Sequence, residues 1–187
     1  MPIPRTILGI DPGTNVLGYG IIHCSGPNKA KLIVLGVIEL AKYPDHYTKL
    51  RAIFDRVQQL VDEYKPNEVA IESPFYGKNV QSMLKLGRAQ GVAMAAVLSR
   101  SIPIYEYAPR KIKLAITGVG SASKEQVAAM LKNILGEKDF DQKYLDATDG
   151  LAAAVCHFFQ GEQVNSDGKT SNWEEFIKKN PKRVRKQ

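Results

Sequence analysis

Four carboxylates stand at positions where secondary structure could bring them together. Asp11 and Glu72 each close a short apolar run of the kind that forms a buried strand. Asp146 and Asp149 are three residues apart in a segment with helical character, so both side chains project from one face. Strand ends at one edge of a sheet, facing a helix, would therefore gather all four carboxylates.

Carboxylates within a few ångströms of one another repel, and a bound cation commonly offsets this repulsion. This set offers oxygen ligands only, which suit Mg²⁺, or Mn²⁺ as a substitute, better than zinc. His23, His46 and His157 are expected to be ordinary surface or core histidines. The pattern therefore indicates a site for a hard divalent cation.

Each acid also has a simpler explanation. Asp11, followed by Pro12 and Gly13, could belong only to a turn, Glu72 could cap the next segment, and Asp146 could be a helix N-cap. For any one acid alone the simpler explanation is the stronger. Asp11 and Glu72 taken together favour a site, because both follow apolar strand residues where α/β folds place their sites.

The hydrophobic pattern predicts the elements that must position these acids. The strands are expected at Thr6–Ile10, Leu17–His23, Lys31–Leu40, Glu68–Glu72 and Ile102–Tyr107. The helices are expected at residues 48–64, at Val80–Ser99, from Ser123 onward, and from Leu145 to Phe159. Ser123 is followed three residues later by Gln126, which is the signature of a helix start.

This order of elements excludes a dinucleotide-binding fold, in which the first glycine-rich turn leads directly into a helix. Here the turn after Asp11 leads into another strand, so the sheet begins as an antiparallel meander. The order favours an α/β fold of the RNase H-like or actin-like kind, with a mixed five-stranded sheet flanked by helices.

The net charge of +7 is concentrated in two regions. Residues 178–187 hold six basic residues and no acids, and removing those six from the 26 Lys and Arg leaves 20 basic against 19 acidic residues. Between Tyr76 and Lys124, eight basic residues accompany a single acid, Glu106. Such a block indicates a surface that binds a polyanion, although a solvated helical surface has the same composition. The candidates on it are Lys78, Arg88, Arg110, Lys113 and Lys124.

A chain of 187 residues suits one compact domain. Residues 1–161 are expected to form it, and residues 162–187 to form a polar, basic and disordered tail. No apolar run reaches the length of a membrane span and the start lacks a signal-peptide pattern, so a cytoplasmic protein is expected. Cys24 and Cys156 are too few and too far apart for a disulfide framework or a zinc site.

Four blocks of the sequence resemble the successive motifs of the RuvC family of Holliday-junction resolvases. They cover roughly residues 5–160 and read ILGIDPGTNVLGYGII, AIESPFYGKNVQSMLKLGRAQGV, YEYAPRKIKLAITGVGSASKEQV and LDATDGLAAAVCH. The resemblance implies that Asp11, Glu72, Asp146 and Asp149 are the catalytic, metal-binding acids. The position of Asp146 can be His in this family, and here it is Asp.

The resemblance also implies a DNA-binding surface. Phe75 matches an aromatic residue that stacks on unpaired bases at the junction centre, although a plain core phenylalanine is the alternative. Arg110, Lys113 and Lys124 match basic positions that hold DNA near the cut. The chain beyond Gly161 matches no block of the family, so a DNA-binding arm and a purely solubilising tail both remain open.

The activity that the resemblance implies is structure-selective cleavage of four-way junction DNA by symmetric paired nicks, in homologous recombination and DNA repair. Its chemistry would be phosphodiester hydrolysis with two Mg²⁺ ions roughly 4 Å apart, leaving 5′-phosphate and 3′-hydroxyl ends. The implied partners are a second copy of the chain and a branch-migration motor complex of the RuvA–RuvB type.

The helix at Val80–Ser99 is the expected contact between two copies. Gly87, Gly91 and Ala95 recur every four residues along it, which makes a stripe where another helix can approach closely. Packing of this stripe against the chain's own sheet is the alternative.

Two other functions fit parts of the pattern. An actin-like ATPase or sugar kinase also carries an Asp-x-Gly phosphate loop on a hairpin, but it needs a second phosphate loop and a longer chain. A junction-binding or RNA-processing module with an RNase H-like shell would explain the basic block. The complete carboxylate set counts against a purely binding role.

Overall fold

The computed structural model describes residues 4–74, 79–137 and 145–166 of the chain. The strands are β1 Arg5–Asp11, β2 Val16–Gly26, β3 Lys29–Glu39, β4 Glu68–Glu72 and β5 Ile104–Tyr107. The helices are α1 His46–Tyr64, α2 Val80–Leu98, α3 Pro109–Thr117, α4 Lys124–Leu135 and α5 Leu145–Ser166.

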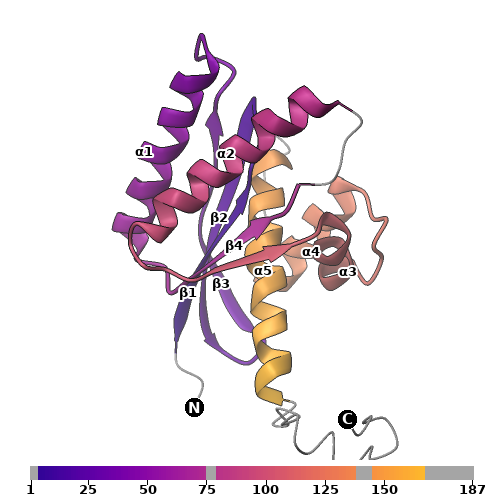
Figure 1. The fold of residues 1–187 in the computed structure, drawn as a ribbon. Helices are drawn as coiled ribbons and strands as arrows, with labels where there is room; N and C mark the ends of the chain where they lie inside the picture. Colours follow the sequence, from indigo (N-terminus) through magenta and orange to yellow (C-terminus); the bar gives the residue numbers. More distant parts are fainter. Residues whose placement is uncertain (1–3, 75–78, 138–144, 167–187) are drawn as a thin grey trace, which may run out of the picture.

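The strands form one mixed sheet in the order β3-β2-β1-β4-β5 (Figure 1). The first three strands pair antiparallel, and β4 and β5 then add in parallel to β1. Ile10 lies opposite Ile71 across the parallel pair, so Asp11 and Glu72 are the next residues on neighbouring strands. The expected five-stranded sheet, with its antiparallel start, is confirmed.

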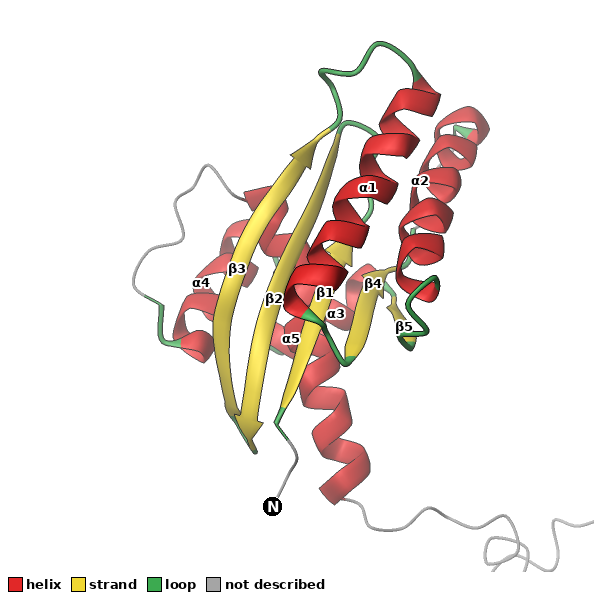
Figure 2. Ribbon diagram, turned by 90° about the vertical axis from the view of Figure 1, so that its left-hand side faces the viewer, coloured by secondary structure: helices red, strands yellow, loops and turns green. Residues whose placement is uncertain are grey.

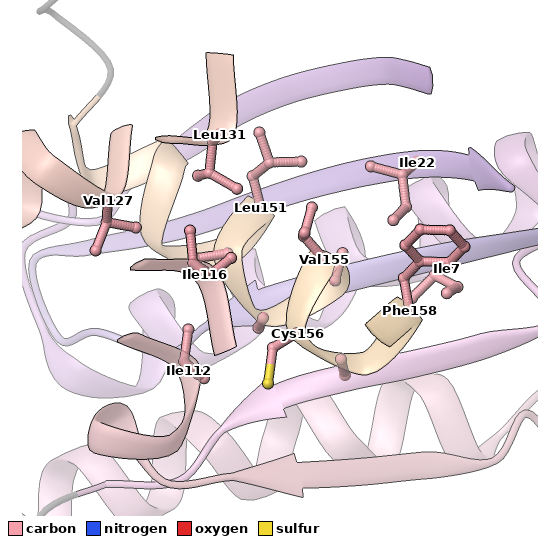
Figure 3. Packing of buried hydrophobic residues seen from close by; sticks show 14 of the residues in the cluster. Ile7, Ile22, Ile112, Ile116, Val127, Leu131, Leu151, Val155, Cys156 and Phe158 are labelled. Carbon is pink, nitrogen blue, oxygen red and sulfur yellow. The ribbon is translucent and has the colours of Figure 1, made fainter. Parts of the chain in front are cut away.

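Helices cover both faces of the sheet, as Figure 2 shows. On one face α1 and α2 pack over a core that includes Leu8, Ile10 and Ile53. On the other face α5 lies along the sheet, flanked by α3 and α4, and the core includes Ile7 and Leu151 (Figure 3). The sheet is therefore the middle of three layers.

Helix α5 approaches β1 and β2 more closely than ordinary side chains would allow. A methyl group at Gly20 would lie 2.7 Å from the Cα atom of Leu151, and a methyl group at Gly150 would lie 2.6 Å from the carbonyl oxygen of Gly18. A methyl group at Gly18 would overlap the backbone carbonyl of Asp146. Glycines therefore set the depth at which the first turns of α5 rest on the sheet.

Most of the expected elements are confirmed, with small shifts of their ends. The capping box of α4 is present, because the Ser123 side chain accepts from the Gln126 amide and the Gln126 side chain accepts from the Ser123 amide. Helix α5 runs to Ser166, beyond the expected end at Phe159. The expected tail at 162–187 therefore begins inside α5, and residues 167–187 lie outside the described residues.

Helix α3 is an element that the hydrophobic pattern did not predict. Its signals are local: Pro109 occupies the first turn, Ile112 and Ile116 are buried one turn apart, and Gly118 ends the helix with a positive φ. A run of only nine residues between a strand and a glycine-rich loop is too short to show helical periodicity clearly.

The small-residue stripe of α2 does not pack against the chain's own sheet. Gly87, Gly91 and Ala95 are exposed, and apart from the adjoining backbone of the helix itself no heavy atom lies within 4 Å of the place that a Cβ atom would take at either glycine. Leu84 and Leu98 are also exposed on this helix, whereas Val92 is half-buried. Packing of the stripe on its own sheet is therefore wrong as an explanation of these residues.

Among the residues that the structure describes, no helix is both long and apolar enough to cross a membrane.

The contact between α5 and the glycines of β2 yields the first testable prediction. Gly18→Ala should destabilise the fold by about 1–3 kcal/mol, because the added methyl meets backbone rather than a movable side chain. Gly26→Ala is the matched control, since Gly26 lies on the same strand with open space around it. Urea denaturation measures both variants, and equal stabilities would contradict the close contact.

Candidate active site

Asp11 and Glu72 are neighbours at the carboxyl ends of β1 and β4, and both side chains are half-buried. Burial, followed by the charges of Asp149 and Asp146, raises the pKa of Asp11 from 3.8 to about 7. Burial, followed by the charges of Asp11 and Asp149, raises the pKa of Glu72 from 4.5 to about 8. The sheet therefore holds two neighbouring acids whose surroundings favour the protonated, neutral form over the carboxylate.

Asp146 and Asp149 come to this edge of the sheet from the first turn and a half of α5. The carbonyl of Asp146 lies against Gly18, which pairs with Asp11 across β1 and β2. Asp149 is half-buried, and burial raises its pKa above the ordinary value. The structure thus brings all four predicted acids to one place, and it sets Asp146 inside the helix rather than before it.

The ammonium group of Lys124 lies against the two aspartates of α5. Its Nζ atom is 2.5 Å from Oδ2 of Asp149 and 3.2 Å from Oδ1 of Asp146. Burial opposes the charge on Lys124, but the ion pairs with Asp149 and Asp146 outweigh it and raise the pKa of the lysine. Lys124 is the first residue of α4, so the capping box at Ser123, which sets the start of the helix, also sets the position of Lys124.

Two further cations come from α3, which follows β5 at the same edge of the sheet. Lys113 is half-buried, and its charge lowers the pKa of Glu72 and of Asp149 in opposition to the larger effect of burial. Arg110 and Lys113 line a shallow cavity of about 470 Å³ together with Pro109, Gly120 and Ser121. A polyanion bound at this cavity would pass beside the acids.

The donor chemistry of this cluster fits a hard divalent cation. Its four carboxylates offer oxygen ligands, and a positive group, the Lys124 ammonium, already lies between two of them. Within the described ranges, no three His, Cys, Asp or Glu side chains have a ready metal-binding arrangement. Binding of an ion would therefore require the carboxylates to turn towards it and Lys124 to withdraw.

Of the remaining predicted site residues, one lies elsewhere and two cannot be placed. Arg88 is exposed on α2, in the helix layer opposite the one that carries Lys113 and Lys124. Phe75 and Lys78 lie outside the described residues, so their predicted contacts with DNA stay predictions.

A buried polar network that sequence reasoning did not single out ties α5 to the parallel strands. His157 Nδ1 lies 2.6 Å from the Tyr107 hydroxyl, and its Nε2 lies 3.2 Å from Glu68, which also pairs with Arg5 at 3.1 Å. Burial lowers the pKa of His157. The expectation of a satisfied core histidine is confirmed, and no spacing in the sequence could have identified its partners.

The sheet order and the acids at the ends of β1 and β4 define an α/β protein of the RNase H-like class. Comparison with known proteins gives the family within that class. The family described as crossover junction endodeoxyribonuclease RuvC matches residues 7–157. The RuvC protein of Porphyromonas gingivalis is 58% identical over 98% of this chain and 99% of its own length. That of Bacteroides fragilis is also 58% identical, over 97% of this chain and 96% of its own length.

Solved structures agree with this assignment. Thermus thermophilus RuvC, in complex with a Holliday junction substrate, superposes with a TM-score of 0.78 at 31% identity, covering 85% of this chain and 96% of that protein. The yeast mitochondrial resolvase Ydc2, at 13% identity and a TM-score of 0.58, supports the fold alone. The chain belongs to the RuvC family of crossover junction endodeoxyribonucleases. This confirms the resemblance and excludes the actin-like alternative.

The raised pKa values of the acids predict how stability depends on pH. The folded protein holds protons on Asp11 and Glu72 that the unfolded chain releases near pH 4, so the contribution of these two acids to stability is greatest below that pH and is lost as the pH rises through about 7 and 8. Asp11→Asn removes one of the opposed charges. In metal-free buffer it should raise the melting temperature at pH 9, with little change at pH 5.

Thermal unfolding by circular dichroism, with EDTA present, measures this effect. Asp55→Asn on α1 is the control, because it removes one negative charge from an exposed ion pair with Arg51 outside the cluster. A melting temperature of Asp11→Asn that stayed below that of the wild type at pH 9 would contradict mutual repulsion of the acids.

Proposed function

We propose that this chain resolves Holliday junctions by hydrolysing one phosphodiester bond per subunit at the carboxylate cluster. The observation that carries the proposal is the meeting of Asp11, Glu72 and Asp149 at one sheet edge, beside the cations Lys113 and Lys124. Family membership supports the four-way junction as substrate, since the Thermus thermophilus relative was solved with one.

Mg²⁺ is the proposed cofactor, with two ions per site and Mn²⁺ as a substitute, held by Asp11, Glu72, Asp146 and Asp149. When bound, such ions activate the attacking water and stabilise charge on the leaving oxygen. The oxygen of that water bonds to phosphorus, the P–O3′ bond breaks, and the 3′ oxygen takes up a proton. The ends are then a 5′-phosphate and a 3′-hydroxyl.

The cations of α3 and α4 have a separate role in this proposal. Lys113 and Lys124 offset the negative charge that grows on the phosphoryl oxygens. Arg110 binds a neighbouring phosphate at the cavity that it lines with Lys113. We also propose Phe75, Lys78 and Arg88 as DNA contacts farther from the cut. Since phosphate contacts release counterions, affinity should fall steeply with salt.

Two copies acting together match a junction whose cuts are related by two-fold symmetry, because each chain carries one carboxylate cluster. The proposed contact is the exposed stripe of Gly87, Gly91 and Ala95 on α2, with Leu84 and Leu98 beside it. Small residues allow a second helix to approach closely, and the exposed leucines supply apolar surface to bury.

We further propose that the dimer acts in the cytoplasm with a branch-migration motor complex of the RuvA–RuvB type. Residues 1–161 would form the nuclease domain. The basic tail at 162–187 would add affinity for DNA of any sequence, since residues 178–187 carry six of the basic residues.

The test of the chemistry is the pair of variants Asp11→Asn and Glu72→Gln. Each should lower junction cleavage in Mg²⁺ by at least about 10³-fold, because a cation ligand is lost while size is kept. Binding to the junction, measured by gel shift in EDTA, should be retained, since less negative charge faces the phosphates. Comparison with duplex DNA and structured RNA tests substrate class. Wild-type cleavage by either variant would refute the assignment.

The test of the dimer is Gly91→Arg. The open space at Gly91 lets the chain fold, but the arginine blocks approach of a second helix. Analytical ultracentrifugation at micromolar concentration should then find single chains, which bind junctions weakly and make no paired cuts. Gly26→Arg, at another open glycine away from α2, should stay dimeric. A wild type that resolves junctions as a single chain would end the proposal.

A further inference from the structure

Lys124 makes the closest contact between opposite charges in the carboxylate cluster. Its Nζ atom lies 2.5 Å from Asp149 and 3.2 Å from Asp146, so the lysine forms an ion pair with each of the two aspartates. Asp149 is half-buried, with 17% of its side chain exposed, so its pair with Lys124 is less screened by solvent than an ordinary surface pair.

The same two carboxylates are among the ligands that a divalent cation at this site would use. The ammonium group of Lys124 would repel a positive ion bound at Oδ2 of Asp149, so the ion pair weakens metal binding. The lack of a ready three-ligand arrangement among the described residues agrees with this, since the lysine holds two of the four acids.

We propose that Lys124 is an internal competitor of the metal, holding Asp146 and Asp149 in the DNA-free protein and releasing them when a DNA phosphate becomes its partner. The inference rests on the proposed function, because it takes the cluster as the metal site and phosphate as the ligand. It goes further by making Lys124 the residue that couples metal binding to DNA binding.

The position of Lys124 suits this exchange. The residue is at the first position of α4, its side chain is 49% exposed, and its stem has four rotatable carbons that can swing the ammonium outward. Lys113 and Arg110, which line the neighbouring cavity, would bring a phosphate strand to the same side. Because linkage is reciprocal, DNA that engages Lys124 strengthens metal binding, and metal that frees Lys124 strengthens DNA binding.

This exchange has a consequence for control of the nuclease. In the absence of DNA the metal competes with a charge that belongs to the chain itself, so its affinity is lowered. A phosphate backbone beside α4 removes this competition, and the hydrolytic centre then binds metal more tightly on substrate than in solution.

The experiment is titration of the full-length, DNA-free protein with Mg²⁺ by isothermal titration calorimetry, repeated with Mn²⁺ by electron paramagnetic resonance. Lys124→Met keeps side-chain length and removes the charge, and it should bind the metal about tenfold more tightly than the wild type, within the range typical of coupled sites. Lys113→Ala is the matched control: it removes one nearby positive charge that acts on Asp149 through space. It should tighten binding by no more than about threefold, because charge that acts through space is more strongly screened.

A second measurement tests the phosphate half of the exchange. In EDTA, Lys124→Met should reduce the slope of log K against log[salt] for junction binding by about 0.9, the value for one lost phosphate contact. A cooperative thermal unfolding transition, followed by circular dichroism, checks that the variant is folded.

The outcomes separate the exchange from the proposed function. Equal metal affinities for Lys124→Met and Lys113→Ala, or an unchanged salt slope, would overturn the exchange while leaving the metal site in place. If Asp149→Asn binds Mg²⁺ as the wild type does, the metal site itself is wrong, and the exchange falls with it.

Discussion

The contact on which the site depends is the one between the backbone of α5 and the glycines of β2. Gly18, Gly20 and Gly150 bring the helix so close to the sheet that no side chain separates them. Because Gly18 is paired with Asp11, the depth of this contact determines how far Asp146 and Asp149 stand from the strand ends. A helix held off by ordinary side chains would sit several ångströms higher, since sheet and helix layers normally pack about 10 Å apart. The acids of α5 would then be out of reach of those on the sheet.

Close packing of acids opposes the stability of the metal-free protein. Burial raises the pKa values of Asp11 and Glu72 to about 7 and 8, so the folded state holds these groups in conditions where an unfolded chain would ionise them freely. The rest of the fold offsets this cost. The cores on the two faces of the sheet bury long runs of apolar side chains, and the Tyr107–His157–Glu68 network fastens α5 to the parallel strands. The acids are therefore carried by rigid elements, as preorganised binding of a charged ligand requires.

The sequence predicted the fold and the four acids because both depend on local patterns. Asp11 and Glu72 follow apolar strands, and Asp146 and Asp149 share a helical spacing, so adjacency in the parallel pair follows from the strand order. The Ser123 capping box was also predicted, because it too is a local pattern in the sequence. Helix α3, the ion pairs of Lys124 and the partners of His157 were not predicted. Helix α3 is too short to show a clear period. The other two depend on contacts between residues far apart in the chain, for example Lys124 with Asp149 or His157 with Glu68, and no periodicity encodes such contacts.

The acidic and the basic residues of the site stand on different secondary-structure elements. Acids stand on the central sheet and on α5, which form the interior of the molecule, whereas Arg110, Lys113 and Lys124 stand on the short peripheral helices α3 and α4. A loop that contains Gly118 and Gly120 joins these two helices. Under the proposed exchange, Lys124 changes its partner from carboxylate to phosphate while the carboxylates turn towards the metal. In the metal-free protein Lys124 pairs with Asp149 and Asp146, and on DNA the proposed exchange gives the same ammonium group a phosphate partner, so opposite charges stay paired in both states.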